Sequence, residues 1–253
     1  MSDVLVETRD GVLIITLNRP QAKNAVTEEV ARRIAAAMDE LDSNPDLRVG
    51  VLTGAEGTFC AGMDLKDFLK GNKPMLPGRG FGGITESPPK KPLIAAVEGW
   101  ALAGGFEIIL ACDMVVAGRT AKFGTPEVKR SLIAAGGGVL LLHKRIPRAV
   151  AMEIILTGDP ITAERAYELG LVNRVVEPGN ALDEALALAA AITPNGPLAV
   201  LGSKELAIRS ADWGFEQAFA EQREIVDRVF GSEDAKEGAA AFAEKRAPQW
   251  QGR

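Results

Sequence analysis

The stretch WALAGGFEIILACD, residues 100–113, places one carboxylate, Glu107, in an apolar run directly after Gly104 and Gly105. A carboxylate among such neighbours is costly to desolvate unless it is paired, hydrogen-bonded or protonated. The run LIAAV before it is typical of a buried strand, and FEIILACD is typical of a helix. The chain therefore passes here from a strand through a small-residue turn into a helix that carries a glutamate in its first turn.

A second turn of the same kind is GTFCAGMDL, residues 57–65, which follows the predicted strand VGVLTG. At such a turn, backbone N–H groups point outward from a helix N-terminus. Two of these turns side by side would supply two donors to a developing oxyanion. The glycine spacing fits neither a P-loop nor a dinucleotide fingerprint. For each turn taken alone, tight packing is the alternative explanation.

A third segment, FGTPEVKRSLIAAGGG at residues 123–138, places Glu127 in a turn rich in small residues. Two carboxylates near one oxyanion site are the equipment for moving a proton and a water molecule. The alternative for Glu127 is a solvated glutamate at a helix start after Pro126.

The remaining pattern predicts an α/β protein. A hairpin is expected around Asp10 and Gly11, followed by an amphipathic helix that begins at Thr27. Residues 70–92, dense in glycine and proline, indicate a mobile loop with a functional role. Alternation of strands and helices gives way to helices alone near residue 190. The stripe of Phe215, Phe219, Ile225, Val226 and Phe230 in this tail is expected to bury against a neighbouring subunit.

Composition narrows the function further. The net charge of −5 argues against a nucleic-acid surface spread over the fold, although a local basic pocket for a phosphorylated ligand remains possible. Only Cys60 and Cys112 are present, which excludes a disulfide scaffold and suits a reducing cytosol. No signal sequence and no membrane-length apolar run is found, so we expect a cytoplasmic protein. The sole histidine, His143, is expected at the surface of a helix end.

Five motifs, taken together, carry a family resemblance: NRPQAKNA, FCAGMDL, ALAGGFE, FGTPEVK and LTGDPITAERAYELGLVNRVV. In this order they resemble the enoyl-CoA hydratase/isomerase (crotonase) superfamily over roughly residues 4 to 250. The resemblance implies a crotonase-like spiral of ββα turns over residues 1–190. It also implies a helical region over residues 191–253 that packs homotrimers, often paired into hexamers.

The resemblance also implies a site. The family's oxyanion donors are matched to the N–H groups of Ala61 and Gly104, and its two glutamates to Glu107 and Glu127. Gly104 would lack a side chain so that its N–H can approach a thioester oxygen. Ionised Glu107 would deprotonate a water that attacks C3 of a 2-enoyl-CoA, and protonated Glu127 would deliver a proton to C2. The pair would share one proton at neutral pH.

Substrate recognition is implied around the first turn, where the family holds coenzyme A. Lys23 and Lys66 are candidates for the phosphates, with ordinary surface lysines as the alternative. Asp64 fits a helix cap better than a substrate contact, and Cys60 fits a packed residue better than a nucleophile. Trp100 stands where tyrosine is frequent in the family, and Ala134-Ala135 stands where Pro-Gly is frequent. These differences leave the length and branching of the acyl chain undetermined. The candidate substrate-binding residues are Lys23, Ala61, Gly62, Met63, Asp64, Leu65, Lys66, Trp100 and Leu132.

The leading hypothesis is an enoyl-CoA hydratase that uses an acyl-CoA thioester as substrate and needs no metal or separate cofactor. Two alternatives share the oxyanion site, namely an enoyl-CoA isomerase and a carnitinyl-CoA-type dehydratase. A third alternative from another class is a CoA-binding or RNA-binding scaffold without turnover. The acidic charge and the low aromatic content of 5% do not favour RNA.

Overall fold

A six-stranded sheet organises the computed structural model, which describes residues 2–253. Its strand order is β1-β2-β3-β6-β8-β11, and only the β1–β2 pair is antiparallel. The predicted hairpin is confirmed, because Arg9 pairs with Val12 across the turn at Asp10 and Gly11. The strands are β1 (Val4–Arg9), β2 (Val12–Leu17), β3 (Val49–Gly54), β6 (Leu93–Val97), β8 (Met114–Gly118) and β11 (Arg174–Val176).

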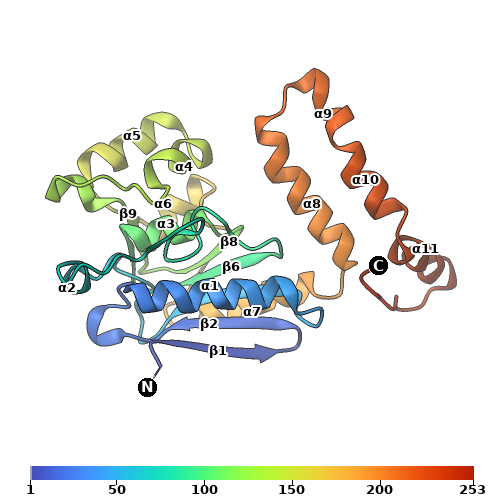
Figure 1. Ribbon diagram of the computed structural model, residues 1–253, viewed down its shortest axis with the longest axis horizontal. Coiled ribbons are helices and arrows are strands. Elements are labelled where there is room, and N and C mark those ends of the chain that lie inside the picture. Colours follow the sequence, from blue (N-terminus) through green and yellow to red (C-terminus); the bar gives the residue numbers. More distant parts are fainter. Residues whose placement is uncertain (1) are drawn as a thin grey trace.

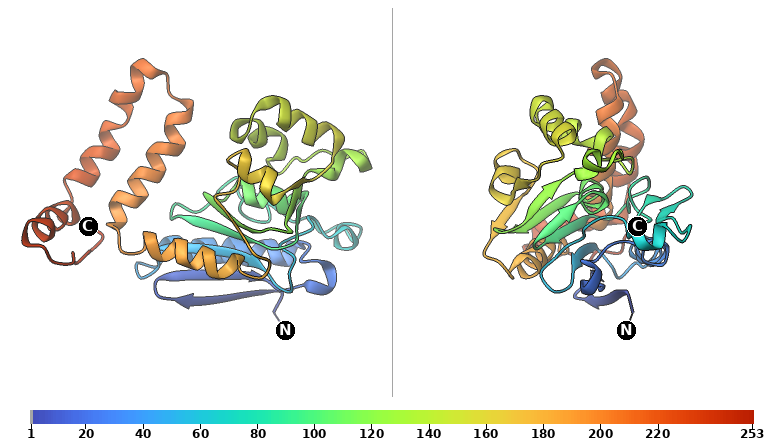
Figure 2. Two further views of the ribbon diagram at one scale, coloured as in Figure 1. Left: turned by 180° about the vertical axis from the view of Figure 1, so that it is seen from behind. Right: turned by 90° about the vertical axis from the view of Figure 1, so that its left-hand side faces the viewer.

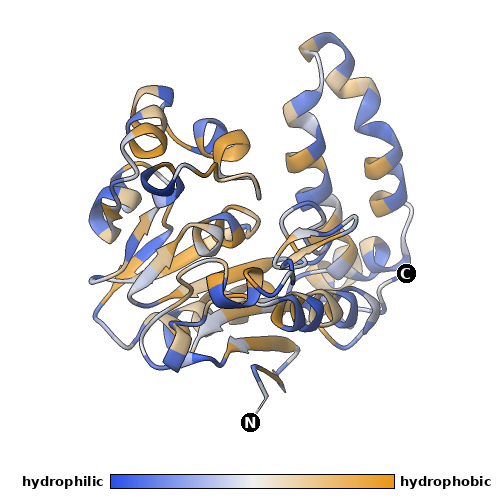
Figure 3. Ribbon diagram, turned by 60° about the vertical axis from the view of Figure 1, so that its left-hand side comes forward, coloured by the Kyte–Doolittle hydropathy of each residue, from blue (hydrophilic) through white to orange (hydrophobic). Residues whose placement is uncertain are grey.

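Helices cover both faces of this sheet (Figure 1). Helix α1 (Glu28–Ser43) packs on one face, and the Thr27 side chain caps it by accepting a hydrogen bond from Val30 N, as predicted. Helix α7 (Ala181–Ile192) lays Ala181, Ala185 and Ala189 on the other face. Burial on both faces explains why the inner strands β2, β3, β6 and β8 read as largely apolar runs, which appear as orange ribbons in Figure 3.

A smaller sheet of order β10-β9-β7 carries the site-forming turns. It consists of β7 (Trp100–Leu102), β9 (Lys122–Gly124) and β10 (Ile161–Thr162). Helix α3 begins directly after β7, and the 3-10 helix η2 begins directly after β9. The two predicted glutamates therefore lie on helices that follow neighbouring parallel strands. The surrounding helices are α3 (Gly104–Leu110), η2 (Pro126–Arg130), α4 (Gly138–Arg145), α5 (Arg148–Thr157) and α6 (Ala163–Glu168). His143 lies exposed near the end of α4, as predicted.

The mobile-loop prediction for residues 70–92 is wrong for its central part. Residues 80–85 are buried, and Phe81 is only 4% exposed. The Thr85 hydroxyl accepts a hydrogen bond from Phe81 N at 2.9 Å, and the Ile84 side chain is fully buried in the main core. The glycine content of this segment predicted a loop. In the structure the same glycines allow the backbone to pack closely against α1 and α3. The short elements here are α2 (Leu65–Phe68), β4 (Met75–Leu76) and β5 (Gly80–Phe81).

Beyond α7 the chain forms a helical arm that extends away from the sheet (Figure 1 and the left view of Figure 2). Its helices are α8 (Pro197–Arg209), α9 (Phe215–Glu221), α10 (Arg223–Phe230) and α11 (Glu233–Glu244). The expectation for Ile225 is wrong, because this side chain is fully buried within the chain, where α10 packs on α8 near Gly202. Phe215, Phe219 and Phe230 remain exposed.

Within residues 2–253, no single helix has the length and apolar composition needed to cross a membrane. Only α7 combined with residues 197–212, two segments bent by 109°, satisfies that test as a pair.

Candidate active site

Glu107 occupies the position that the sequence singles out, in the first turn of α3. Its side chain is 4% exposed, and its Oε1 accepts a hydrogen bond from Gly138 N at 3.0 Å. Gly136 lies against the other oxygen, since a Cβ added there would come within 2.6 Å of Glu107 Oε2. The glycine run at 136–138 therefore lets the backbone close around this carboxylate. The glycine run is visible in the sequence, but only the fold shows that it lines Glu107.

The pKa of Glu107 is raised to about 7, chiefly by burial and also by the nearby Glu127 carboxylate, whereas the hydrogen bonds from Gly138 and Gly136 act to lower it. Glu127, which lies in η2, is half-buried, and burial raises its pKa as well. Its Oε2 is buried and has no hydrogen-bond partner among the described residues. The structure thus brings the two predicted carboxylates together, and burial favours the protonated form of each.

The N–H donors beside this pair differ in part from the expected ones. Ala61 N donates to the Lys23 carbonyl at 3.1 Å, so this N–H is already used within the chain. The assignment of Ala61 as an oxyanion donor is therefore wrong. Met63 N has no acceptor among the described residues, although Gly62 and Asp64 on either side are bonded to Val26. Met63 thus offers an N–H without an acceptor at the point where this turn meets Gly104.

Gly104 offers the second free N–H, because the first residues of a helix have no acceptor in their own helix. The two turns touch, since a Cβ at Gly62 would come within 3.2 Å of Gly104 N. The expected reason for glycine at 104 is incomplete. A Cβ there would overlap the ring of Phe81, so glycine is needed for packing whether or not a ligand approaches.

Ala103, just before Gly104, adopts φ 51° and ψ −128°, a backbone conformation that residues other than glycine rarely take. Its N–H donates to the Gly124 carbonyl at 2.9 Å, which fixes β7 to β9 at this point. Such strain persists only where the surroundings over-determine it, and it clusters at functional sites. Here it turns the chain sharply from β7 into α3 and so aims the Gly104 N–H.

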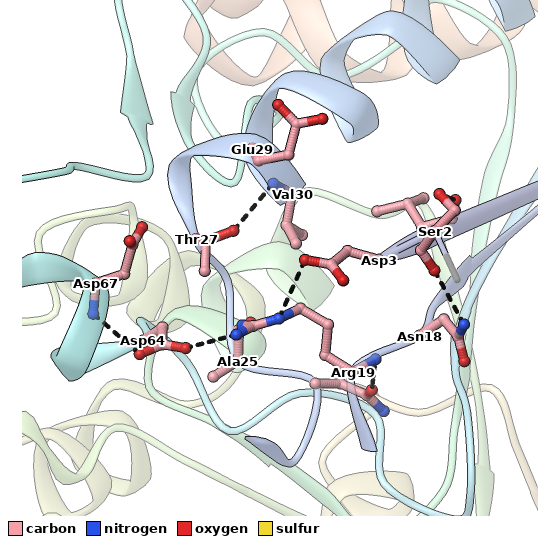
Figure 4. Close-up of polar contacts among 12 residues, drawn as sticks. Ser2, Asp3, Asn18, Arg19, Ala25, Thr27, Glu29, Val30, Asp64 and Asp67 are labelled. Atoms are coloured by element: carbon pink, nitrogen blue, oxygen red, sulfur yellow. Dashed lines mark hydrogen bonds and ion pairs between the residues drawn. The ribbon is translucent and has the colours of Figure 1, made fainter. Parts of the chain in front are cut away.

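An arginine that was not among the predicted site residues anchors the first turn (Figure 4). The Arg19 guanidinium donates to the Ala25 carbonyl at 2.5 Å and to Asp64 Oδ2 at 2.9 Å, and it pairs with Asp3 at 3.3 Å. Asp64 caps α2 by accepting from Lys66 N and Asp67 N, as expected. Burial opposes ionisation of Asp64, but the Arg19 and backbone hydrogen bonds lower its pKa overall.

The other predicted binding residues line the surface around the first turn or lie farther away. Lys23, Leu65 and Lys66 are exposed beside it, and Cys60 is fully buried, where burial raises the pKa of its thiol. Trp100 lies at the start of β7, at the opposite end of that strand from Gly104, and is 41% exposed. Leu132 follows η2, and its N–H donates to the Glu127 carbonyl at 3.1 Å.

Two carboxyl groups with raised pKa values thus lie in the same region of an α/β fold as two N–H groups without acceptors, a combination suited to acid–base chemistry beside an oxyanion. The family model for enoyl-CoA hydratase/isomerase matches residues 7–253, and the chain belongs to this family, the crotonase superfamily.

Named relatives agree with this assignment. The chain is 47% identical to enoyl-CoA hydratase EchA19 of Mycobacterium tuberculosis, with 99% of this chain and 97% of the relative covered. It is 41% identical to a carnitinyl-CoA dehydratase of Proteus mirabilis, with 97% of each covered. A crystal structure of an enoyl-CoA hydratase from Mycobacterium tuberculosis H37Rv superposes with a TM-score of 0.97 at 59% identity, covering 99% of both chains.

Proposed function

We propose that this chain is an enoyl-CoA hydratase, which adds water reversibly across the double bond of a 2-enoyl-CoA thioester. The observation that carries the proposal is the pair Glu107 and Glu127, whose pKa values are both raised by burial beside two free N–H groups. The relatives named enoyl-CoA hydratase support the same reaction. An acyl-CoA substrate is consistent with the family, and the thioester itself takes part in the reaction, so no separate cofactor is proposed.

In the proposed mechanism, Met63 N–H and Gly104 N–H receive the thioester oxygen and stabilise the enolate. Glu107 takes a proton from water as the water oxygen bonds to C3, and Glu127 gives its proton to C2. The N–H donors from Gly138 and Gly136 favour the anionic form of Glu107 within the pair. The unpartnered Oε2 of Glu127 favours the protonated form of that residue. The base role of Glu107 and the acid role of Glu127 are therefore part of the proposal.

The remaining site and assembly assignments stand as proposals. Coenzyme A is proposed to bind along Gly62 to Lys66, with Lys23 and Lys66 near its phosphates and with Trp100 and Leu132 toward the acyl group. A homotrimer or hexamer is supported by the exposed phenylalanines of the arm. The proposed boundary at residue 190 falls in the last turn of α7, which still covers the sheet, so we move it to residues 193–196. Two buried free cysteines suit the proposed cytoplasmic location.

The test of the function is turnover of a panel of acyl-CoA thioesters, from crotonyl-CoA to long-chain and carnitinyl-CoA substrates. We expect hydration of crotonyl-CoA. Glu107→Gln and Glu127→Gln should each lower kcat by about 10² or more with little change in KM, because glutamine cannot exchange the proton. The double variant should be barely slower than the slower single one, since groups that act as a unit are strongly non-additive.

Two results would point elsewhere. Activity on carnitinyl-CoA alone would favour the dehydratase, a possibility raised by the relatives with that name. If Glu107→Gln kept full activity while Glu127→Gln lost it, a one-base isomerase would replace the hydratase proposal.

A further inference from the structure

Among the described residues, two buried side-chain oxygens have no hydrogen-bond partner: Thr125 Oγ1 and Glu127 Oε2. Both belong to the short connection from β9 into η2. The Thr125 side chain is more deeply buried than Glu127, with only 1% of its surface exposed. Leaving a buried hydroxyl unsatisfied is costly, and most buried polar atoms in folded proteins are partnered. Two such atoms, two residues apart in the chain, are both available to hydrogen-bond a bound molecule.

The position of Thr125 relative to Glu107 follows from Gly138. A Cβ added at Gly138 would come within 3.3 Å of Thr125 Cγ2 and within 3.2 Å of Glu107 Oε1. The Thr125 methyl group and the Glu107 carboxylate thus lie against the same glycine, and the Thr125 hydroxyl is the other branch on the same Cβ. Gly124, the residue before Thr125, accepts the Ala103 hydrogen bond that fixes the start of α3. Thr125 is consequently held at the junction of the two glutamate-bearing segments, on rigid backbone.

A reacting water needs more than one partner to be oriented. Buried waters typically make about three hydrogen bonds, and a hydroxyl can both donate and accept. Glu107 takes the proton that leaves the water, and Glu127 gives the proton that C2 receives. An acceptor for the second O–H bond of the water, the bond that does not break, is then needed to turn the oxygen lone pair toward C3. Thr125 Oγ1 is the buried, unpartnered oxygen available for it.

We propose that Thr125 is a third side chain of the water site, which orients the nucleophilic water by accepting its non-transferred O–H. This inference rests on the proposed hydratase function. The step balances: the water oxygen bonds to C3, one water proton passes to Glu107, and the π electron pair shifts toward the thioester. The Glu127 proton then bonds to C2, and Thr125 gains and loses no proton.

The test compares Thr125→Val, Thr125→Ser and Thr53→Val in the full-length protein. Thr125→Val keeps the shape and removes the hydroxyl, so kcat for hydration of crotonyl-CoA should fall at least about tenfold with KM within about twofold. Its Tm should stay equal or rise, because no hydrogen bond inside the chain is lost. Thr125→Ser restores the hydroxyl and should keep kcat within about threefold of wild type.

Thr53 is the matched control, because its buried hydroxyl donates to the Ala96 carbonyl at 2.9 Å. Thr53→Val should lower Tm and leave kcat unchanged, which is the opposite signature. Wild-type kcat in Thr125→Val would overturn the inference, and so would equal losses in Thr125→Val and Thr125→Ser. Absence of hydration by the wild type on every enoyl-CoA would instead overturn the proposed function.

Discussion

The sheet-bearing part of the chain and the C-terminal arm place the same residue type in opposite environments. Phe59, Phe106 and Phe123 are fully buried around the site, and the rings of Phe106 and Phe123 lie 6.1 Å apart. In the arm, Phe215 is 83% exposed and Phe219 is 63% exposed, and their two rings pack edge to edge. The first region completes its core within one chain. The second presents apolar surface that monomeric proteins rarely leave open in contiguous patches.

The largest expected effect comes from truncating a buried phenylalanine near the site and comparing the loss of stability with that caused by truncating exposed phenylalanines of the arm. Phe123→Ala should lower the free energy of unfolding by about 3–5 kcal/mol, because it leaves a cavity in a closed core. The pair Phe215→Ser and Phe219→Ser should lower it by less than about 1 kcal/mol within a single chain. The measurement is urea unfolding at dilute protein concentration.

The same arm variant should weaken self-association, which sedimentation at micromolar concentration measures. Wild-type protein that sediments only as a monomer would remove the assembly proposal. An arm variant that assembles as well as wild type would show that these two rings are not the contact.

The next effect concerns the energetic cost of the site inside the closed region. Burial raises the pKa of Glu107 from 4.5 to about 7, which corresponds to about 3 kcal/mol between its two protonation states. Above pH 7 the native protein holds a buried anion that the unfolded chain solvates freely, so the native state is destabilised there. Below pH 4.5 the carboxyl is protonated in both states and this cost vanishes.

At pH 8, Glu107→Gln should therefore be more stable than wild type in urea unfolding, with a free energy of unfolding higher by up to about 3 kcal/mol. This advantage should shrink toward pH 5. Glu153→Gln, a change at an exposed position on α5, serves as the control and should alter stability at neither pH. A Glu107→Gln protein that is less stable than wild type at pH 8 would contradict the cause given for the shift.

The smallest effect concerns the connection between the two regions. The Lys204 ammonium on α8 donates to Asp113 Oδ2 at 2.6 Å, to the Pro89 carbonyl at 2.9 Å and to the Lys91 carbonyl at 3.0 Å. Lys204 is 11% exposed at its side chain, and Asp113 also accepts from Leu93 N. The contact therefore fastens the arm to the start of β6.

Lys204→Met should cost about 2 kcal/mol, since it leaves the partly buried Asp113 unpaired. Lys236→Met breaks an exposed pair with Glu233 and should cost less than about 0.5 kcal/mol. Both are measured by urea unfolding, and equal losses in the two variants would mean that Lys204 does not fasten the arm.

The sequence predicted those features that depend on local pattern. The hairpin at Asp10 and Gly11, the Thr27 cap and the glutamate after Gly105 follow from neighbouring residues, and the structure contains all three. The joint order of the five motifs predicted the family correctly.

The errors arose where distant segments decide. Whether Ala61 or Met63 offers a free N–H depends on how the turn pairs with residues 23–26, about forty positions earlier. The burial of residues 80–85 depends on Phe81 reaching Gly104, which glycine content alone did not indicate. Ile225 reads as part of an exposed stripe until α8 is known to cover it. In each case the missing information is which backbone lies opposite, and no local periodicity encodes it.

The reaction of the two fully buried cysteines with a thiol reagent can report how often the protein opens locally. Cys60 lies in the turn of residues 57–65, and Cys112 lies just after α3, beside Asp113. Burial raises the pKa of both thiols, so neither is a thiolate at physiological pH and neither reacts while the fold is closed. An alkylating reagent can therefore reach Cys60 only when the turn beside the active site opens. It can reach Cys112 only when the region between α3 and the Lys204 contact opens. The chain thus carries two natural labelling sites that time local opening at its active site and at the base of its arm.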